Sequence, residues 1–106
     1  MGDFTIIYKI LAILDKHKGE EDFDYAAISA AAMKTEYANW EQIMIEMQEN
    51  GLIRGLVYSR SLSEKFPHIR EPICPVITLR GMEYIEENSM MSKAKELLKT
   101  AAAFMP

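Results

Sequence analysis

The chain has 106 residues, 49% of them hydrophobic, and a formal net charge of −4. This size fits one domain with one core, and the negative charge excludes a protein that coats nucleic acid or anionic membranes through its overall charge. The single cysteine excludes an intrachain disulfide, and no apolar run approaches the roughly 18 residues that a bilayer span requires. We therefore expect a cytoplasmic protein with no membrane partner.

The first half of the chain predicts three helices. Asp3 is a candidate N-cap for a first helix, which Gly19 terminates. The alanine-rich segment 25–33 follows Asp24 and predicts a short second helix. The third helix follows the turn Lys34-Thr35, with Thr35 as its cap, and ends at Asn50-Gly51. Its core face consists of apolar residues at helical spacing, namely Tyr37, Trp40, Ile43, Met44 and Met47.

The second half predicts two strands and a last helix. Residues 52–59 form a candidate strand with a possible kink at Gly55, and residues 73–78 form its partner across the polar loop 59–72. Pro72 and Pro75 lack amide donors, which favours an edge strand. Thr78 is the candidate cap of the helix that follows. The order of elements predicts an α+β winged helix-turn-helix with three helices, a two-stranded β-hairpin wing and a C-terminal helix.

Residues 1–88 are expected to form the winged-helix domain, and residues 89–106 a C-terminal helical extension of it. Apolar residues continue at helical spacing to Met105, so an unbroken helix would project from the domain and favour a homodimer through this helix. Alternatively, Asn88 and Ser89 are both favoured caps and could split the segment into two helices that fold back. The sequence leaves both interpretations open.

The same order of elements, together with five stretches of sequence, resembles the YjcQ-like family. The stretches are residues 4–11, 28–29, 40–43, 49–55 and 77–91. The resemblance implies a small winged-helix protein of Gram-positive bacteria and their prophages, in a phage-associated or regulatory setting. It implies no catalytic motif, so no functional residue is transferred from it.

Charge is unevenly distributed along the chain. Residues 1–50 carry four basic and ten acidic side chains, a balance of −6, whereas residues 51–106 carry eight and six, a balance of +2. The third helix has four glutamates and no Lys or Arg, so it is expected to repel a DNA duplex. A DNA-binding regulator that contacts double-stranded DNA through its wing is the first hypothesis. The candidate contacts to the DNA backbone are Lys34, Arg54, Arg60, Lys65 and Arg70.

One alternative is that these basic residues only solvate a loop. Another is that the chain is a protein–protein interaction module that does not bind DNA. An acidic helix beside a basic wing can steer a host or phage protein, to which the chain would be an adaptor or inhibitor. Ile45 lies off the apolar face of the third helix and is a candidate exposed contact. Met91 and Leu98 on the last helix complete this candidate interaction surface.

We expect no enzyme, no metal site and no cofactor. His17, His68 and Cys74 lie in different predicted elements and lack the spacing of metal ligands or of a nucleophile and its base. The five glycines are dispersed, so no phosphate-binding loop is present. Cys74, in an apolar context, is expected to be buried or half-buried.

Overall fold

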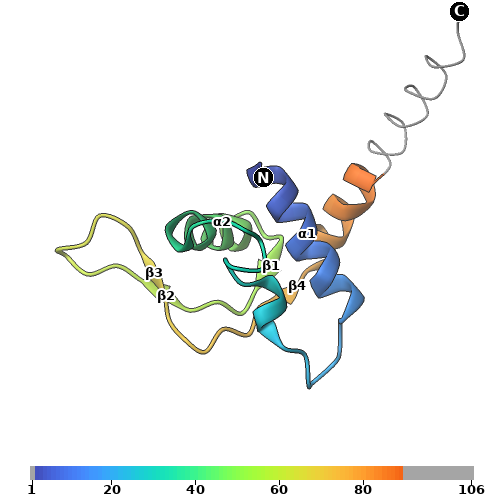
Figure 1. Ribbon diagram of the computed structural model, residues 1–106, viewed down its shortest axis with the longest axis horizontal. Helices are drawn as coiled ribbons and strands as arrows, with labels where there is room; N and C mark the ends of the chain where they lie inside the picture. The colour runs from blue at the N-terminus through green and yellow to red at the C-terminus, as the bar shows by residue number, and fades with distance from the viewer. Residues whose placement is uncertain (1, 90–106) are drawn as a thin grey trace, which may run out of the picture.

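The computed structural model describes residues 2–89 and has an α+β architecture of helices and two short antiparallel strand pairs, one among the helices and the other in a segment that extends away from them (Figure 1). A further helix covers residues 79–89 and is orange in Figure 1. The other elements, in chain order, are helix α1 (Asp3–Lys16), 3-10 helix η1 (Tyr25–Ile28), helix α2 (Tyr37–Glu49) and strands β1 (Ile53–Arg54), β2 (Tyr58–Ser59), β3 (His68–Ile69) and β4 (Val76–Ile77).

Helices α1 and α2 supply most of the core, as their apolar periodicity predicts. α1 begins after Gly2, so Asp3 stands in its first turn rather than at its N-cap. α2 begins after Glu36, and the Thr35 hydroxyl accepts from the Asn39 side chain at 3.0 Å instead of capping the helix backbone. The buried hydrophobic residues of the two helices are Ile6, Ile10, Leu11, Leu14, Trp40, Ile43, Met44, Ile45 and Met47.

The predicted second helix begins at Tyr25 as expected, but its predicted extent to residue 33 is wrong. Asp24 caps the 3-10 helix η1, since its carboxylate accepts from the Ala26 amide at 3.0 Å, but η1 ends at Ile28. The Trp40 indole N–H donates a hydrogen bond to the Ile28 carbonyl at 2.7 Å. The backbone of the next residue, Ser29, is extended, with ψ of 166°. Ser29 then starts a separate turn by accepting from the Ala32 amide at 3.2 Å. Hydrogen bonds from the Trp40 and Ser29 side chains to the backbone therefore compete with helical hydrogen bonds and divide the alanine-rich segment in two.

The end of α2 follows the prediction. The Leu52 amide donates to the Met47 carbonyl at 2.9 Å, and the Gly51 amide donates to the Gln48 carbonyl at 3.0 Å. Gly51 has φ of 77°, so the helix closes with a Schellman motif.

The single β-hairpin wing predicted over residues 52–78 is wrong, because the structure has two separate strand pairs. β1 pairs with β4, with Ile53 opposite Ile77, and β2 pairs with β3, with Tyr58 opposite Ile69. Gly55, at φ of 100°, interrupts the outgoing limb, and a Cβ there would lie 2.6 Å from the Cys74 carbonyl oxygen. In the returning limb, Pro75 has no amide to donate to a ladder. The chain therefore pairs at the base, separates, and pairs again in a protruding arm.

We call residues 57–70, which contain β2 and β3, the arm; it extends away from α1 in Figure 1. Cys74, in the limb that returns from it, is exposed, which corrects the expectation that it is buried or half-buried. Within residues 2–89 no helix combines the length and apolar character that a bilayer crossing requires.

Thr78 caps helix 79–89 as predicted. Its hydroxyl accepts from the Gly81 amide at 3.0 Å and donates to the Gly51 carbonyl. One side chain thus joins the end of α2 to the start of the last described helix. Residues 88 and 89 are still helical, and the side-chain amide of Asn88 donates to the Tyr84 carbonyl at 2.8 Å. The helix is therefore not broken before residue 89.

Candidate functional site

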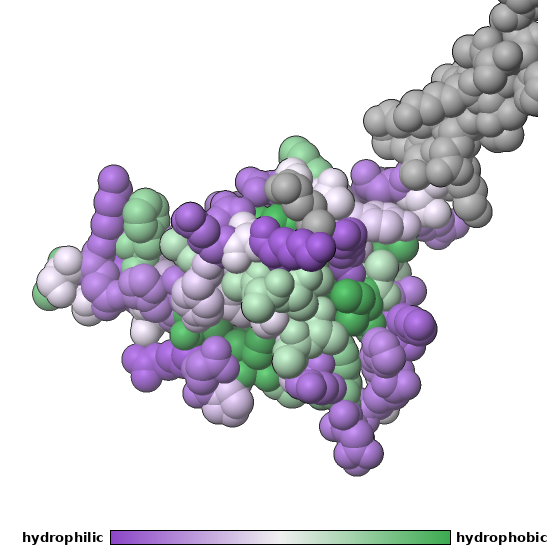
Figure 2. Space-filling model, in the orientation of Figure 1, coloured by the Kyte–Doolittle hydropathy of each residue, from purple (hydrophilic) through white to green (hydrophobic). Residues whose placement is uncertain are grey.

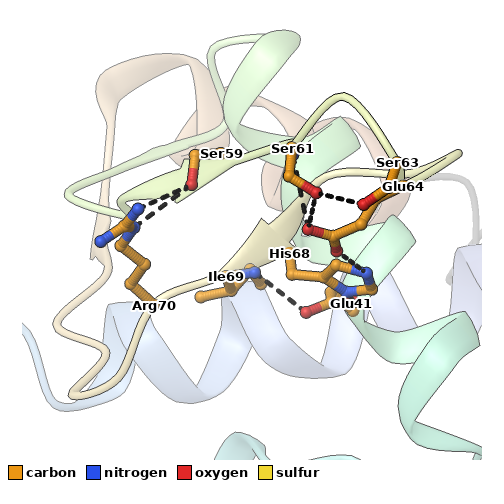
Figure 3. Close-up of polar contacts among 8 residues, drawn as sticks. All are labelled: Glu41, Ser59, Ser61, Ser63, Glu64, His68, Ile69 and Arg70. Atoms are coloured by element: carbon orange, nitrogen blue, oxygen red, sulfur yellow. Dashed lines mark hydrogen bonds and ion pairs between the residues drawn. The ribbon is translucent and has the colours of Figure 1, made fainter.

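One face of α2 holds the arm in place. Glu41, Ile45 and Gln48 are spaced four and three residues apart, so they share this face. Glu41 is a glutamate with only 3% exposure. Its carboxylate accepts from the Ile69 amide at 2.9 Å and contacts His68 Nδ1 at 2.8 Å (Figure 3). A buried carboxylate is stable only with such partners, so Glu41 ties β3 to α2.

Gln48 fixes the chain where it enters the arm. Its side-chain amide donates to the Leu56 carbonyl at 3.0 Å and accepts from the Leu56 amide at 2.8 Å. A glutamine side chain can make this double contact because it carries both a donor and an acceptor. It satisfies the backbone of a residue that lies between β1 and β2 and has no ladder partner there.

Ile45 is not exposed, which corrects its assignment to the interaction surface. It has 4% exposure and lies between Glu41 and Gln48 on the face that the arm covers. The arm folds back on α2, so the second side of the helix becomes part of the core. Met91 and Leu98, the other candidate contacts, lie outside the described residues.

His68 sits between two carboxylates on the arm side of α2. Nδ1 contacts Glu41 at 2.8 Å, and Nε2 contacts Glu64 at 2.7 Å (Figure 3). The hydrogen bond to Glu41 raises the pKa of His68 above its usual 6.5, and the charge of Glu64 acts in the same direction. The Ser61 hydroxyl, 2.6 Å from Glu64, lowers the pKa of Glu64, with His68 as a further cause.

We expect the arm to be held more tightly in acid than in alkali. The folded-state pKa of His68 is raised, so its stabilisation is fully present below the unfolded-state pKa of about 6.5 and is lost as pH rises through the folded value. Amide hydrogen exchange of Ile69, corrected for intrinsic rates, should therefore speed up from about pH 5.5 to about pH 8.5. The His68→Gln variant should lose this pH dependence, and its retention in that variant would contradict the assignment.

The five basic residues proposed as DNA contacts are all exposed, namely Lys34, Arg54, Arg60, Lys65 and Arg70. In the described part of the chain none of them forms an ion pair. The structure groups three of them, Arg60, Lys65 and Arg70, in the arm. Arg54 lies on β1 at the base of the arm, and Lys34 lies in the turn before α2, with φ of 54°.

Arg70 is the basic side chain of the arm with the most definite position. Its Nε and one terminal nitrogen donate to the Ser59 hydroxyl at 3.2 and 3.1 Å, across the β2–β3 pair (Figure 3). Lys65 Nζ lies 5.4 Å from the centre of the Phe66 ring. Because neither cation is neutralised by an acid, each keeps its charge available to an anionic ligand.

Exposed apolar side chains lie among these basic residues. Val57, Leu62 and Phe66 have 63%, 106% and 50% exposure. Figure 2 shows hydrophobic side chains among the hydrophilic ones on the arm. Sequence reasoning did not single out these residues, although their interleaving with Arg60 and Lys65 is visible in the sequence. Among the residues that the structure describes, no group of three or more His, Cys, Asp or Glu side chains is placed to hold a metal.

The family model described as YjcQ protein matches residues 8–103. The chain belongs to the YjcQ family. No curated protein and no solved structure matches it. The YjcQ match begins in α1 and includes α2, the whole arm and helix 79–89. The hydrogen bonds by which Glu41 and Gln48 hold the arm and its entry therefore lie within the matched residues.

Proposed function

We propose that this YjcQ-family protein is a small, non-enzymatic winged-helix protein that binds double-stranded DNA through its arm, in a prophage-associated regulatory setting. In this proposal η1, the following turn and α2 correspond to the helix-turn-helix, and the arm corresponds to the wing. The Arg and Lys side chains of the arm contact phosphates, so they supply affinity more than sequence selectivity.

The observation that carries the proposal is the unpaired positive charge of the arm. The arm contains three basic residues, Arg60, Lys65 and Arg70, and one acidic residue, Glu64. Its formal charge is therefore +2 with His68 neutral. Glu64 is already engaged by Ser61 and His68. A cationic hairpin held against a helix loses little conformational freedom on binding, which favours affinity.

The arrangement of α2 supports contact through the arm rather than through a recognition helix. The face of α2 that bears Glu41, Ile45 and Gln48 is covered by the arm. Of the residues that α2 exposes, Glu46 and Glu49 are acidic and would be repelled by phosphates. Glu41, which the sequence analysis counted among the repelling charges, is buried. The duplex is therefore expected to approach the arm and to avoid the middle of α2.

Reversing two charges of the arm is expected to abolish most DNA binding. If all five basic residues contact phosphates, the logarithm of the affinity should fall with the logarithm of salt concentration with a slope of about −4.5. The double variant Arg60→Glu and Lys65→Glu should weaken binding at least about tenfold and bring the slope to about −2.7. Fluorescence anisotropy with a labelled duplex across a salt series measures both quantities.

A matched control is available on α1. Lys9 and Lys16 are exposed and lie outside the arm, so Lys9→Glu with Lys16→Glu makes the same change in net charge. It should leave most of the affinity and the salt slope intact. Equal losses in the two double variants would mean that overall charge, not the arm, governs binding, and no binding of the unchanged protein at low salt would refute the proposal.

The exposed apolar residues of the arm favour a second candidate, a protein–protein interaction module that acts as an adaptor or inhibitor. Leu62 and Phe66 would then occupy apolar pockets of a host or phage protein, with the basic residues steering the approach. The double variant Leu62→Ser and Phe66→Ser separates the two candidates. It should abolish a protein interaction while leaving phosphate-driven DNA binding nearly unchanged.

A further inference from the structure

We propose that a groove on the side of the molecule that bears helix 79–89 is a self-association surface, and that its occupant is residues 90–106 of a second copy of the chain. The groove lies between the start of α1, the end of α2 and helix 79–89, and has a volume of about 520 Å³. None of the five basic residues assigned to DNA contact lines it, so this proposal is independent of DNA binding.

The floor of the groove is apolar. Ile7, Met47, Leu52 and Tyr84 line it, and Phe4 stands at its edge with 77% exposure. An aromatic side chain this exposed beside an open apolar groove leaves hydrophobic area for a partner to bury. The groove is therefore suited to a segment with several large apolar side chains.

The rim of the groove is acidic. Glu46, Glu83 and Glu87 line it together with one basic residue, Arg80, which gives a formal charge of −2. A suitable occupant therefore combines apolar side chains with positive charge.

Residues 90–106 have the composition that the groove requires. Three lysines, at 93, 95 and 99, oppose one glutamate, at 96, and give a formal charge of +2. The apolar residues of the segment include four methionine and leucine side chains before residue 99 and Phe104 and Met105 near the end. Both the hydrophobic content and the charge of the segment are complementary to the groove.

Chain continuity favours a second copy over the same copy. Helix 79–89 is itself one wall of the groove, and residue 90 follows directly from the end of that wall. Residues 88 and 89, the candidate break, are helical. This favours the interpretation in which the apolar spacing continues on one helix, which would carry the segment out of its own groove rather than across it. Two copies related by a twofold axis place each segment in the groove of the other, and this arrangement closes as a dimer.

Charge exchange between full-length variants tests the proposal by sedimentation equilibrium. The unchanged protein should reach twice its monomer mass as concentration rises. The groove variant is Glu83→Lys with Glu87→Lys, and the segment variant is Lys93→Glu with Lys99→Glu. Each should raise the dissociation constant of the dimer at least about tenfold. An equimolar mixture of the two should dimerise again, since both grooves then face segments of opposite charge.

A control reversal at Glu21→Lys with Asp22→Lys, outside the groove, should leave the dimer intact. A monomer at every concentration, or a mixture that stays dissociated, would overturn the proposal. Neither result would bear on DNA binding, because every variant keeps the basic residues of the arm.

Discussion

Replacing Glu41 by Ala is expected to lower the free energy of unfolding by about 2–3 kcal/mol and to release the arm from α2. The substitution removes the acceptor of the Ile69 amide, which lies on the edge of β3 that does not face β2. It also leaves a void where the buried side chain packed. Urea denaturation measures the loss of stability, and hydrogen exchange of arm amides measures the release.

Two variants separate the role of the Glu41 carboxylate from a general effect of substitution. Glu41→Gln keeps an oxygen acceptor for the Ile69 amide, so its loss of stability should be the smaller one. Glu46→Ala removes an exposed glutamate from the same helix and should change stability by less than about 0.5 kcal/mol. If Glu41→Ala behaves like Glu46→Ala, Glu41 does not hold the arm.

Gly81→Ala is expected to destabilise the protein by about 2 kcal/mol or more, although Ala is the better helix former. A Cβ at this position would lie 2.3 Å from the Leu52 carbonyl oxygen and 2.7 Å from an Ile77 side-chain carbon. The backbone of helix 79–89 touches the β1–β4 pair here, so the helix must move away from the sheet to admit a methyl group. The steric penalty exceeds the gain of about 1 kcal/mol in helix propensity.

Gly51→Ala is the matched comparison, since Gly51 is a glycine with positive φ but without a backbone clash. Its φ is 77°, and the nearest atom to an added Cβ is Arg80 Cδ at 3.4 Å. This substitution should cost about 1 kcal/mol, the usual strain of a left-handed residue. Thermal unfolding of both variants measures which substitution destabilises the protein more. A Gly81→Ala protein as stable as the parent would contradict the close packing of helix 79–89.

The parts of the fold that local signals determine were predictable from the sequence. The periodicity of apolar residues predicts α1 and α2, Gly51 predicts the end of α2, and Thr78 predicts the start of helix 79–89. In each case the interaction that decides the element lies within a few residues along the chain. The resemblance to the YjcQ family, which uses the same stretches, is confirmed by the family match over residues 8–103.

The parts that long-range contacts determine were not predictable. The Trp40 indole donates a hydrogen bond to the carbonyl of Ile28, the last residue of η1 and twelve residues earlier in the chain. The local alanine content alone favours a longer helix. The backbone of Gly55 closely approaches the Cys74 carbonyl, nineteen residues later, at a point where the two limbs form no ladder. Ile45 is buried because the arm, more than ten residues later in the sequence, folds back over α2.

The candidate site follows the same division. Exposure of the basic residues could be predicted, since lysine and arginine are rarely buried. Their gathering in one wing was also predicted, but the position of Arg70 beside Ser59 was not, because it depends on the second strand pair. The contacts of Glu41 with Ile69 and His68 were also not predicted, because a glutamate in a helix is expected to be exposed unless its partners in β3 are known.

The central proposal is that the arm, fixed on α2, is the surface that contacts DNA. Titration of the isotope-labelled protein with a short duplex, followed by nuclear magnetic resonance, tests it most directly. The account predicts that shifts in the amide signals of residues 2–89 are concentrated in residues 57–70, with smaller changes at Arg54 and Lys34. Shifts concentrated instead in the groove beside helix 79–89, or no shifts at low salt, would contradict it.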